Sequence, residues 1–396
     1  MSVLILTCSL TAAGQRTPPV SSPDSVQTLK VDVTLVPVHV VVRDTNGQAV
    51  GNLTKDDFQV FDQGKAQVIK QFSIERSGGQ GAESAGASTQ AASQARLIAY
   101  LFDDLHLGHE DLTRARESAD RQLASLSPAT DRAAIFTTSG RKWVDFTADR
   151  TKLHEMLAQL EPRGKPLASP CPAMTYYMAD LIADKGDREA LSAVANEVVS
   201  CAFNGDMRFR RQAAQVATAV AREKTEIGKA ETANSLRVLK ALVEAMSTAP
   251  GRRMIVLVSP GFFVRDGRLQ EEITELAVRS DVAISALDPR GLVPRIELDP
   301  RMTSYETWAG IQDAAVLEGL TDATGGTFFH NNNDVDEGFR RVSATPEYSY
   351  VLAFAPQNLK FDGRFRALKV TVNNDAKLSV QARRGCYAPK RKPRCD

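Results

Sequence analysis

The segment Arg96–Glu110, RLIAYLFDDLHLGHE, decides the fold that we expect for this chain. It opens with the apolar run Leu97–Phe102, and the adjacent carboxylates Asp103 and Asp104 follow this run directly. A short apolar run that ends at polar residues is typical of a strand buried on both faces of a sheet. Because an amphipathic helix is predicted next, at residues 111–126, the two acids should lie at the carboxyl end of a central strand. Ligands bind at that edge in open α/β sheets.

Strands and helices alternate over residues 96–345, which predicts an α/β domain with a doubly wound, mostly parallel sheet of the Rossmann-like kind. A proline-rich stretch and Ala-rich helical segments interrupt the alternation, so we expect an inserted helical section at residues 163–233. The last of its helices, Phe209–Met246, is long enough to predict a break near Gly228. After the next two strands we expect a loop and then a helix over Ile311–Thr324.

Two portions rich in strand patterns flank this domain, at residues 28–76 and 346–396, the second ending in a basic tail. Neither portion is large enough to bury a core alone. We therefore predict that the N- and C-terminal strands pack together as one small β unit, with the α/β domain inserted between them. Residues 77–95 are a low-complexity linker of Gly, Ser and Ala, and residues 1–27 are a signal peptide and a flexible leader.

The composition of the chain limits the kinds of partner that we expect. Its 396 residues are 43% apolar, which is ample for a core, and 49 basic residues balance 48 acidic ones. This balance gives no electrostatic reason to expect nucleic acid or an anionic membrane surface as a partner. Beyond the first residues no run reaches the roughly 18 apolar residues of a membrane span. The expected partner is thus another protein or a component of the cell envelope.

The first residues and the cysteines both indicate export. Residues 3–14 form an apolar run followed by small residues, as in a secretory signal peptide, which predicts a periplasmic or extracellular protein. Four cysteines would remain after cleavage, an even number that suggests disulfides in an oxidising compartment. Local spacing favours the pairs Cys171–Cys201 and Cys386–Cys395, with free buried thiols as the alternative.

Several motifs together resemble a von Willebrand factor type A (VWA) domain, and more narrowly the VWFA-related proteins that are abundant in acidobacterial genomes. The VWA-like segments are Phe102-Asp103, Ala134–Thr137, Ile255–Ser259 before Gly261, and Thr324–Thr327. The narrower resemblance adds Asp56-Asp57-Phe58, Asp62-Gln63-Gly64, YLFDDLHL, Tyr350-Val351-Leu352 and Arg383–Tyr387. It covers residues 28–390. It implies a VWA fold and a role in binding other proteins.

VWA domains commonly hold a divalent metal at the carboxyl edge of the sheet, and here that pattern is damaged. The family's first loop reads Asp-x-Ser-x-Ser, but from Asp103 the two Ser positions hold Leu105 and Leu107. The Asp of the third loop is replaced by Pro260, which has no side-chain ligand. Thr175 is a candidate for the Thr of the second loop. The resemblance therefore implies a degenerate metal-ion-dependent adhesion site.

A different metal site stays open as an alternative. Asp103, Asp104, His106 and His109 crowd together, and the two histidines at i and i+3 could share one helical face. These residues would hold Mg, Mn or Zn. The simpler interpretation is a solvated loop whose acids favour the N-terminus of the following helix through its dipole.

We expect a non-catalytic protein without a cofactor. Neither a GxSxG nucleophile elbow nor a phosphate-binding glycine motif occurs near the predicted strand ends. The first alternative is a metal-dependent adhesion module with nonstandard Asp/His ligands, and the second is an enzyme that uses the Asp/His cluster. The residues expected to contact the partner are Asp103, Asp104, His106, Thr175 and Ser259.

Overall fold

The computed structural model describes residues 35–45, 49–76, 96–168, 171–292, 300–343, 348–357, 360, 362–373 and 377–388. The predicted signal peptide and leader, the linker at residues 77–95, the basic tail and Cys395 lie outside the described residues. Among the helices that are described, none combines the length and the apolar character that a membrane crossing requires.

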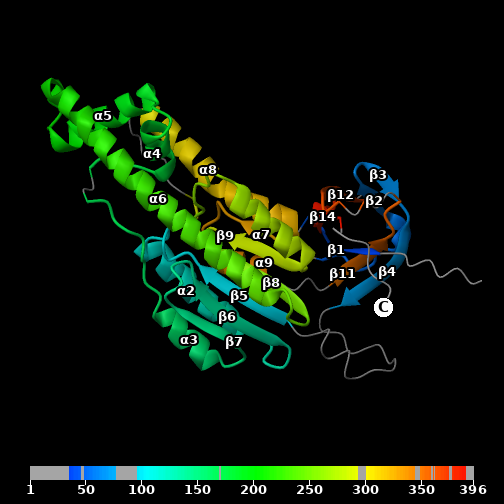
Figure 1. Ribbon diagram of the computed structural model, residues 1–396. Coiled ribbons are helices and arrows are strands. Elements are labelled where there is room, and N and C mark those ends of the chain that lie inside the picture. Colours follow the sequence, from blue (N-terminus) through cyan, green and yellow to red (C-terminus); the bar gives the residue numbers. More distant parts are fainter. Residues whose placement is uncertain are drawn as a thin grey trace, which may run out of the picture. The chain divides into compact units, whose positions relative to one another are not determined.

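A six-stranded sheet forms the centre of the α/β portion (Figure 1). Five strands are parallel and β7 pairs antiparallel with β6 at one edge. The chain is thus a mixed α/β protein with a mostly parallel sheet, compatible with a Rossmann-like fold, as the alternating pattern predicts. The order is β10 (Phe328–Phe329), β9 (Val282–Leu287), β8 (Arg252–Val258), β5 (Arg96–Phe102), β6 (Asp131–Thr137) and β7 (Trp143–Thr147).

Helices cover both faces of this sheet because alternate residues of its strands point to opposite sides. Tyr100 and Phe102 of β5 pack with α2 (His109–Ala124), α3 (Arg150–Ala158) and α9 (Val335–Ser343). Ala99 and Leu101 pack on the other face, with three further helices. These are α6 (Arg210–Met246), α7 (Arg268–Arg279) and α8 (Pro300–Thr324). β5 is consequently buried on both faces.

The helical section packs as a separate core against the first half of α6. It contains α4 (Tyr176–Ala183), α5 (Arg188–Ala202) and the short η2 (Met207–Phe209). A disulfide joins Cys171 to Cys201. The predicted break in the long helix is wrong, because α6 runs unbroken through Gly228. A Cβ at Gly228 would lie 2.3 Å from Cγ of Tyr176, so the glycine lets α4 cross α6 closely.

The helix α8 is also longer than the sequence pattern predicts. It begins at Pro300, whereas we expect a loop there and a helix only from Ile311. Met302 is buried in the core of the helical section, and Tyr305 packs against the same core. These tertiary contacts extend the helix beyond the segment whose own pattern is helical.

Strands from both ends of the chain build two four-stranded sheets around one core. In the first sheet β11 lies between β1 and β4, so the C-terminal strand is hydrogen-bonded on both sides to N-terminal strands. In the second sheet β12 pairs with β2. The boundaries that we assign to the domains stay predictions. The elements are β1 (Val36–Arg43), η1 (Lys55–Asp57), β2 (Phe58–Asp62), β3 (Lys65–Gln67), β4 (Ile69–Arg76), β11 (Tyr348–Phe354), β12 (Phe365–Val372), β13 (Ser379–Ala382) and β14 (Gly385–Tyr387).

The second predicted disulfide joins Cys386 to a residue outside the described part of the chain. Cys386 of β14 is a free and buried thiol within the core of these two sheets, and burial raises its pKa. A thiol packed among apolar side chains behaves as a small hydrophobic residue. The predicted partner of Cys386, Cys395, lies outside the described residues, so the pairing Cys386–Cys395 stays a prediction.

Candidate functional site

The register of three parallel strands brings together the residues that follow them. Phe102 at the end of β5 pairs with Thr137 of β6 on one side and with Val258 of β8 on the other. The next residue along each strand is polar: Asp103, Thr138 and Ser259. Because the strands are parallel and end in register, these three side chains meet at the carboxyl edge of the sheet.

Asp103 is the centre of this cluster and is fully buried, with 0% of its surface exposed. Its carboxylate accepts hydrogen bonds from Oγ1 of Thr138 at 2.8 Å and Oγ of Ser259 at 2.5 Å. Nδ1 of His106 lies 2.8 and 2.9 Å from its two oxygens. Burial alone would raise the pKa of Asp103, but the charge of His106 and the hydrogen bonds from all three partners hold it below its usual value.

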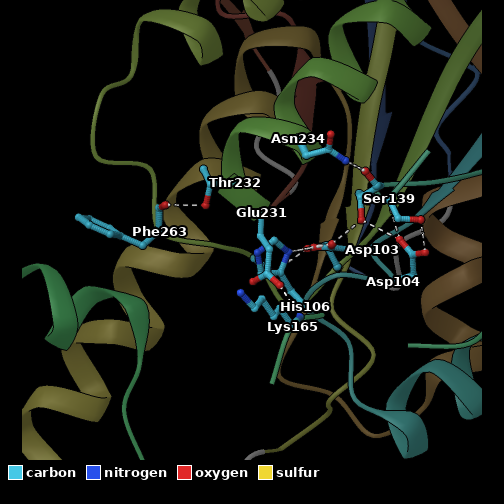
Figure 2. A network of polar contacts seen from close by, with 12 residues as sticks. Asp103, Asp104, His106, Ser139, Lys165, Glu231, Thr232, Asn234 and Phe263 are labelled. Carbon is cyan, nitrogen blue, oxygen red and sulfur yellow. Dashed lines mark hydrogen bonds and ion pairs between the residues drawn. The ribbon is translucent and has the colours of Figure 1, made fainter. Parts of the chain in front are cut away.

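The neighbouring acid, Asp104, is 2% exposed and is bound by the loop that follows β6. It accepts hydrogen bonds from the backbone N–H of Ser139 at 2.8 Å and from its Oγ at 2.6 Å. Oγ1 of Thr138 lies 3.1 Å from the same carboxylate. Burial outweighs these hydrogen bonds and raises the pKa of Asp104. Figure 2 shows Asp103 and Asp104 side by side, with Ser139 directed at the second.

His106 provides the positive charge of the cluster. Its ring stacks on Phe262, with the centroids 5.0 Å apart. Burial lowers the pKa of His106, but the contact with Asp103 and the charges of Glu231 and Asp313 raise it above the usual value overall. Since the pKa of Asp103 is lowered, Nδ1 of His106 donates to an ionised carboxylate, and the raised pKa of His106 favours the imidazolium form in this contact.

The loop after β8 holds Ser259 in place by packing against α8. The N–H of Gly261 donates to Oγ of Ser259 at 3.0 Å, and the N–H of Phe262 donates to the carbonyl of Asp313 at 3.1 Å. Gly261 has φ +86°, and a Cβ there would lie 2.1 Å from the carbonyl oxygen of Asp313. Burial raises the pKa of the Asp313 carboxyl to about 6, against the opposing charges of Arg290, His106 and Lys224.

Further contacts cover the cluster. The N–H of Arg163 donates to the carbonyl of Asp104 at 2.6 Å, and Nδ2 of Asn234 donates to the carbonyl of Thr138 at 2.6 Å. The N–H of Lys165 binds the Glu231 carboxylate at 2.7 Å, beside His106 (Figure 2). The residues around Lys165 and the helix α6 thus close the edge from one side.

These contacts change the interpretation of the residues expected to bind a partner. Only 0–2% of the surface of Asp103, Asp104 and Ser259 is exposed. Their side chains form hydrogen bonds with one another or with adjacent residues, so a partner cannot contact them in this structure. They join the ends of three strands instead. His106 keeps 17% of its side chain exposed and is the accessible member of the predicted set.

Thr175 does not belong to this cluster. Its hydroxyl accepts a hydrogen bond from the N–H of Met178, so it caps the N-terminus of α4. The threonine that contacts Asp103 is Thr138, which our sequence reasoning missed along with Ser139. The signal was present, since both residues directly follow a predicted parallel strand.

The predicted metal ligands are not assembled. His109 begins α2 and is exposed, while His106 uses Nδ1 to bind Asp103. Within the described residues, no group of three or more His, Cys, Asp or Glu side chains is placed to hold a metal ion. The carboxylate oxygens of Asp103 would bind the ion at an intact metal site. Here they contact the ring of His106 instead.

Comparisons with known proteins add limited information. No protein-family model matches the sequence, and no curated protein matches it. Among solved structures, the chain is similar to an aerotolerance-related membrane protein from Bacteroides fragilis, with 11% identity, a TM-score of 0.30, and coverage of 63% of this chain and 98% of the other. It is also similar to the conserved hypothetical protein BatB from Bacteroides thetaiotaomicron, with 12% identity, a TM-score of 0.31, and coverage of 63% and 97%.

Proposed function

We propose that the chain is an exported, non-catalytic binding module of the VWA kind with a degenerate metal-ion-dependent adhesion site. In this proposal His106 supplies, from within the chain, the positive charge that a divalent metal supplies at an intact site of that family. The observation that carries the proposal is the contact of His106 Nδ1 with both oxygens of the buried Asp103 carboxylate, at 2.8 and 2.9 Å.

The geometry supports binding that needs no metal. A hard cation such as Mg²⁺ requires several oxygen ligands with free lone pairs and near-octahedral space. The oxygens of Asp103 already accept from Thr138, Ser259 and His106, and the third loop offers Pro260 in place of a carboxylate. An ion would first have to displace His106. This displacement breaks the contact of His106 with the buried carboxylate of Asp103, which then needs a new partner for its charge.

The same contacts support a role without catalysis. A general acid or base must reach the proton that it transfers within hydrogen-bond distance. Asp103 and Asp104 are closed off by their own neighbours, so a substrate cannot reach their carboxylates without rearrangement. Contact with a partner would instead involve the accessible rim around His106, which includes the exposed residues His109 and Lys165.

Export is supported by the disulfide between Cys171 and Cys201. Disulfides form and persist in oxidising compartments such as the periplasm and the extracellular space. The segment that would direct export lies outside the described residues, so this part of the proposal depends on the sequence pattern and the disulfide together.

The test is affinity capture of envelope proteins and envelope components on the immobilised full chain, with and without EDTA. We expect capture that EDTA leaves unchanged and that the charge reversal Lys165→Glu at the rim weakens. Lys152→Glu on α3, also exposed, is the matched control and should capture normally. Loss of capture in EDTA would favour the metal-dependent alternative, and equal capture by both variants would contradict binding at this rim.

A further inference from the structure

A cavity of about 170 Å³ lies at the opposite, amino edge of the parallel sheet. Its walls come from the starts of β5, β8 and β9, from α7 and α9, and from β1 and β13 of the terminal strands. The turn at Gly325-Gly326 forms part of the wall, and a Cβ at Gly326 would lie 1.8 Å from the carbonyl oxygen of Ile284. The glycines let the chain pass tightly beside β9.

The charges that line this cavity are strongly unbalanced. Among the described residues one carboxylate lines it, that of Asp281, and its oxygen lies 3.6 Å from Nε2 of His39, which also lines the wall. Six guanidinium groups face this single acid. They belong to Arg43, Arg96, Arg252, Arg253, Arg341 and Arg383.

Three of the arginines have carboxylate partners outside the lining. Arg96 pairs with Asp131 at 2.7 Å, Arg252 with Glu75, and Arg341 with Glu337 at 2.6 Å. Their charges are thereby compensated. Two of the lining arginines, Arg43 and Arg341, also repel each other. Burial lowers the pKa of Arg43, and the positive charge of Arg341 lowers it further.

Arg253 and Arg383 differ, because within the described residues they donate to carbonyl oxygens and not to carboxylates. Arg253 donates to the carbonyl of Ser247 at 2.9 Å. Arg383 donates to the carbonyls of Val278 and Pro37. The Nε–H group of each is buried and has no hydrogen-bond partner in the part of the chain that the structure describes. A buried donor without a partner is costly, and guanidinium groups match carboxylate and phosphate oxygens in geometry.

Apolar side chains also form part of the wall, so the cavity suits more than a bare ion. Val41, Met254, Val278, Val282 and Val342 line it beside the arginines. Ligand sites typically combine such a wall with a few polar groups that fix orientation. The volume of about 170 Å³ limits the occupant to a small molecule.

We propose that this cavity binds a small organic anion, in which a carboxylate or phosphoryl group is held by Arg253 and Arg383 and an apolar body lies against the valines. The shared chemistry is an oxyanion on a short apolar chain. This site is separate from the carboxyl edge, and it does not depend on the function proposed there.

The test is calorimetric titration of the full chain with hexanoate, hexyl phosphate and the uncharged hexanol. We expect one of the two anions to bind at a single site, and the tighter one identifies the headgroup. Hexanol should bind at least about tenfold more weakly, a difference of about 1.4 kcal/mol. No saturable heat for either anion up to about 10 mM, where the binding free energy is only about 3 kcal/mol, would overturn the proposal.

Variants locate the site. Arg253→Gln and Arg383→Gln should each weaken anion binding about tenfold or more, as loss of a charged hydrogen bond of about 1.5–3 kcal/mol predicts. Arg268→Gln on α7, which removes an exposed charge paired with Asp266, is the matched control and should bind normally. If Arg383→Gln does not fold, Arg253→Gln alone decides. Equal binding by Arg253→Gln and wild type, or equal binding of hexanol, would overturn the proposal.

Discussion

The two edges of the central sheet handle buried charge in opposite ways. At the carboxyl edge the buried Asp103 carboxylate accepts hydrogen bonds from Thr138, Ser259 and His106. At the amino edge three of the six arginines that line the cavity pair with carboxylates outside it, whereas within the described residues the buried Nε–H groups of Arg253 and Arg383 have no hydrogen-bond partner. Balanced charges hold strand ends together. In our proposal the headgroup of a bound anion supplies the acceptor that the unpaired donors of the amino edge lack.

The largest expected effect concerns Asp103 at the closed edge. Replacement by Ala leaves His106, whose side chain is 17% exposed, without its carboxylate partner, and removes the acceptor for Thr138 and Ser259. Breaking one side of a buried ion pair costs about 3–5 kcal/mol. We therefore expect Asp103→Ala to lower the free energy of unfolding by that amount in urea denaturation.

The matched control for this variant is Glu110→Ala, which removes an exposed acid from the first turn of α2. Its effect should stay within about 1 kcal/mol, the usual contribution of a charge at a helix terminus. If both variants lost a similar amount of unfolding free energy, the contacts of Asp103 would contribute no more to stability than an exposed acid does.

The second effect concerns the turn that positions Ser259. Gly261 has a positive φ and lies against the carbonyl of Asp313, so Gly261→Ala introduces both backbone strain and a clash. Strain at such a φ costs on the order of 1–3 kcal/mol before the clash is counted. We expect a loss of at least about 2 kcal/mol in the free energy of unfolding. Gly267→Ala, where an added Cβ meets nothing within 4 Å, serves as the control.

The third and smallest effect is a gain in stability that depends on pH. The pKa of Asp313 is raised to about 6 from 3.8, so the native state binds a proton that the unfolded state has already released between these values. Stability contributed by the neutral group is complete below about pH 4 and is lost as the pH rises to about 6.

Asp313→Asn removes this ionisation and should be more stable than wild type above pH 6. A pKa raised from 3.8 to about 6 corresponds to about 3 kcal/mol, which solvent screening at this partly exposed site reduces to about 1–2 kcal/mol. The two proteins should become equally stable near pH 4. Thermal unfolding at several pH values measures the difference. A variant that is less stable at pH 7 than wild type would show that attraction to Arg290 and His106 outweighs the burial of Asp313.

Sequence reasoning placed the parallel strands and the first acid correctly because these features are local. A continuous apolar run predicts a buried strand, and Asp103 and Ser259 follow two such runs directly. Thr138 follows a third, but we sought the threonine of the family pattern further along the chain and chose Thr175. A rule that takes the residue directly after each of the three central parallel strands would have found Thr138 beside Asp103 and Ser259.

Features that depend on contacts between distant segments could not be predicted from local sequence patterns. The arginines of the amino edge come from five separate segments, from Arg43 to Arg383, and no local pattern joins them. The unbroken course of α6 through Gly228 depends on the ring of Tyr176, which belongs to another helix. Tertiary contacts decide such features, and helix propensity alone does not.

The most direct test of the account is calorimetric titration of the full chain with Mg²⁺, Mn²⁺ and Zn²⁺ at pH 7. If His106 takes the place of the metal at Asp103, none of the three ions will give saturable heat. One ion bound per chain, with the loss of that binding in a variant of Asp103, would contradict the account and restore the metal-dependent alternative.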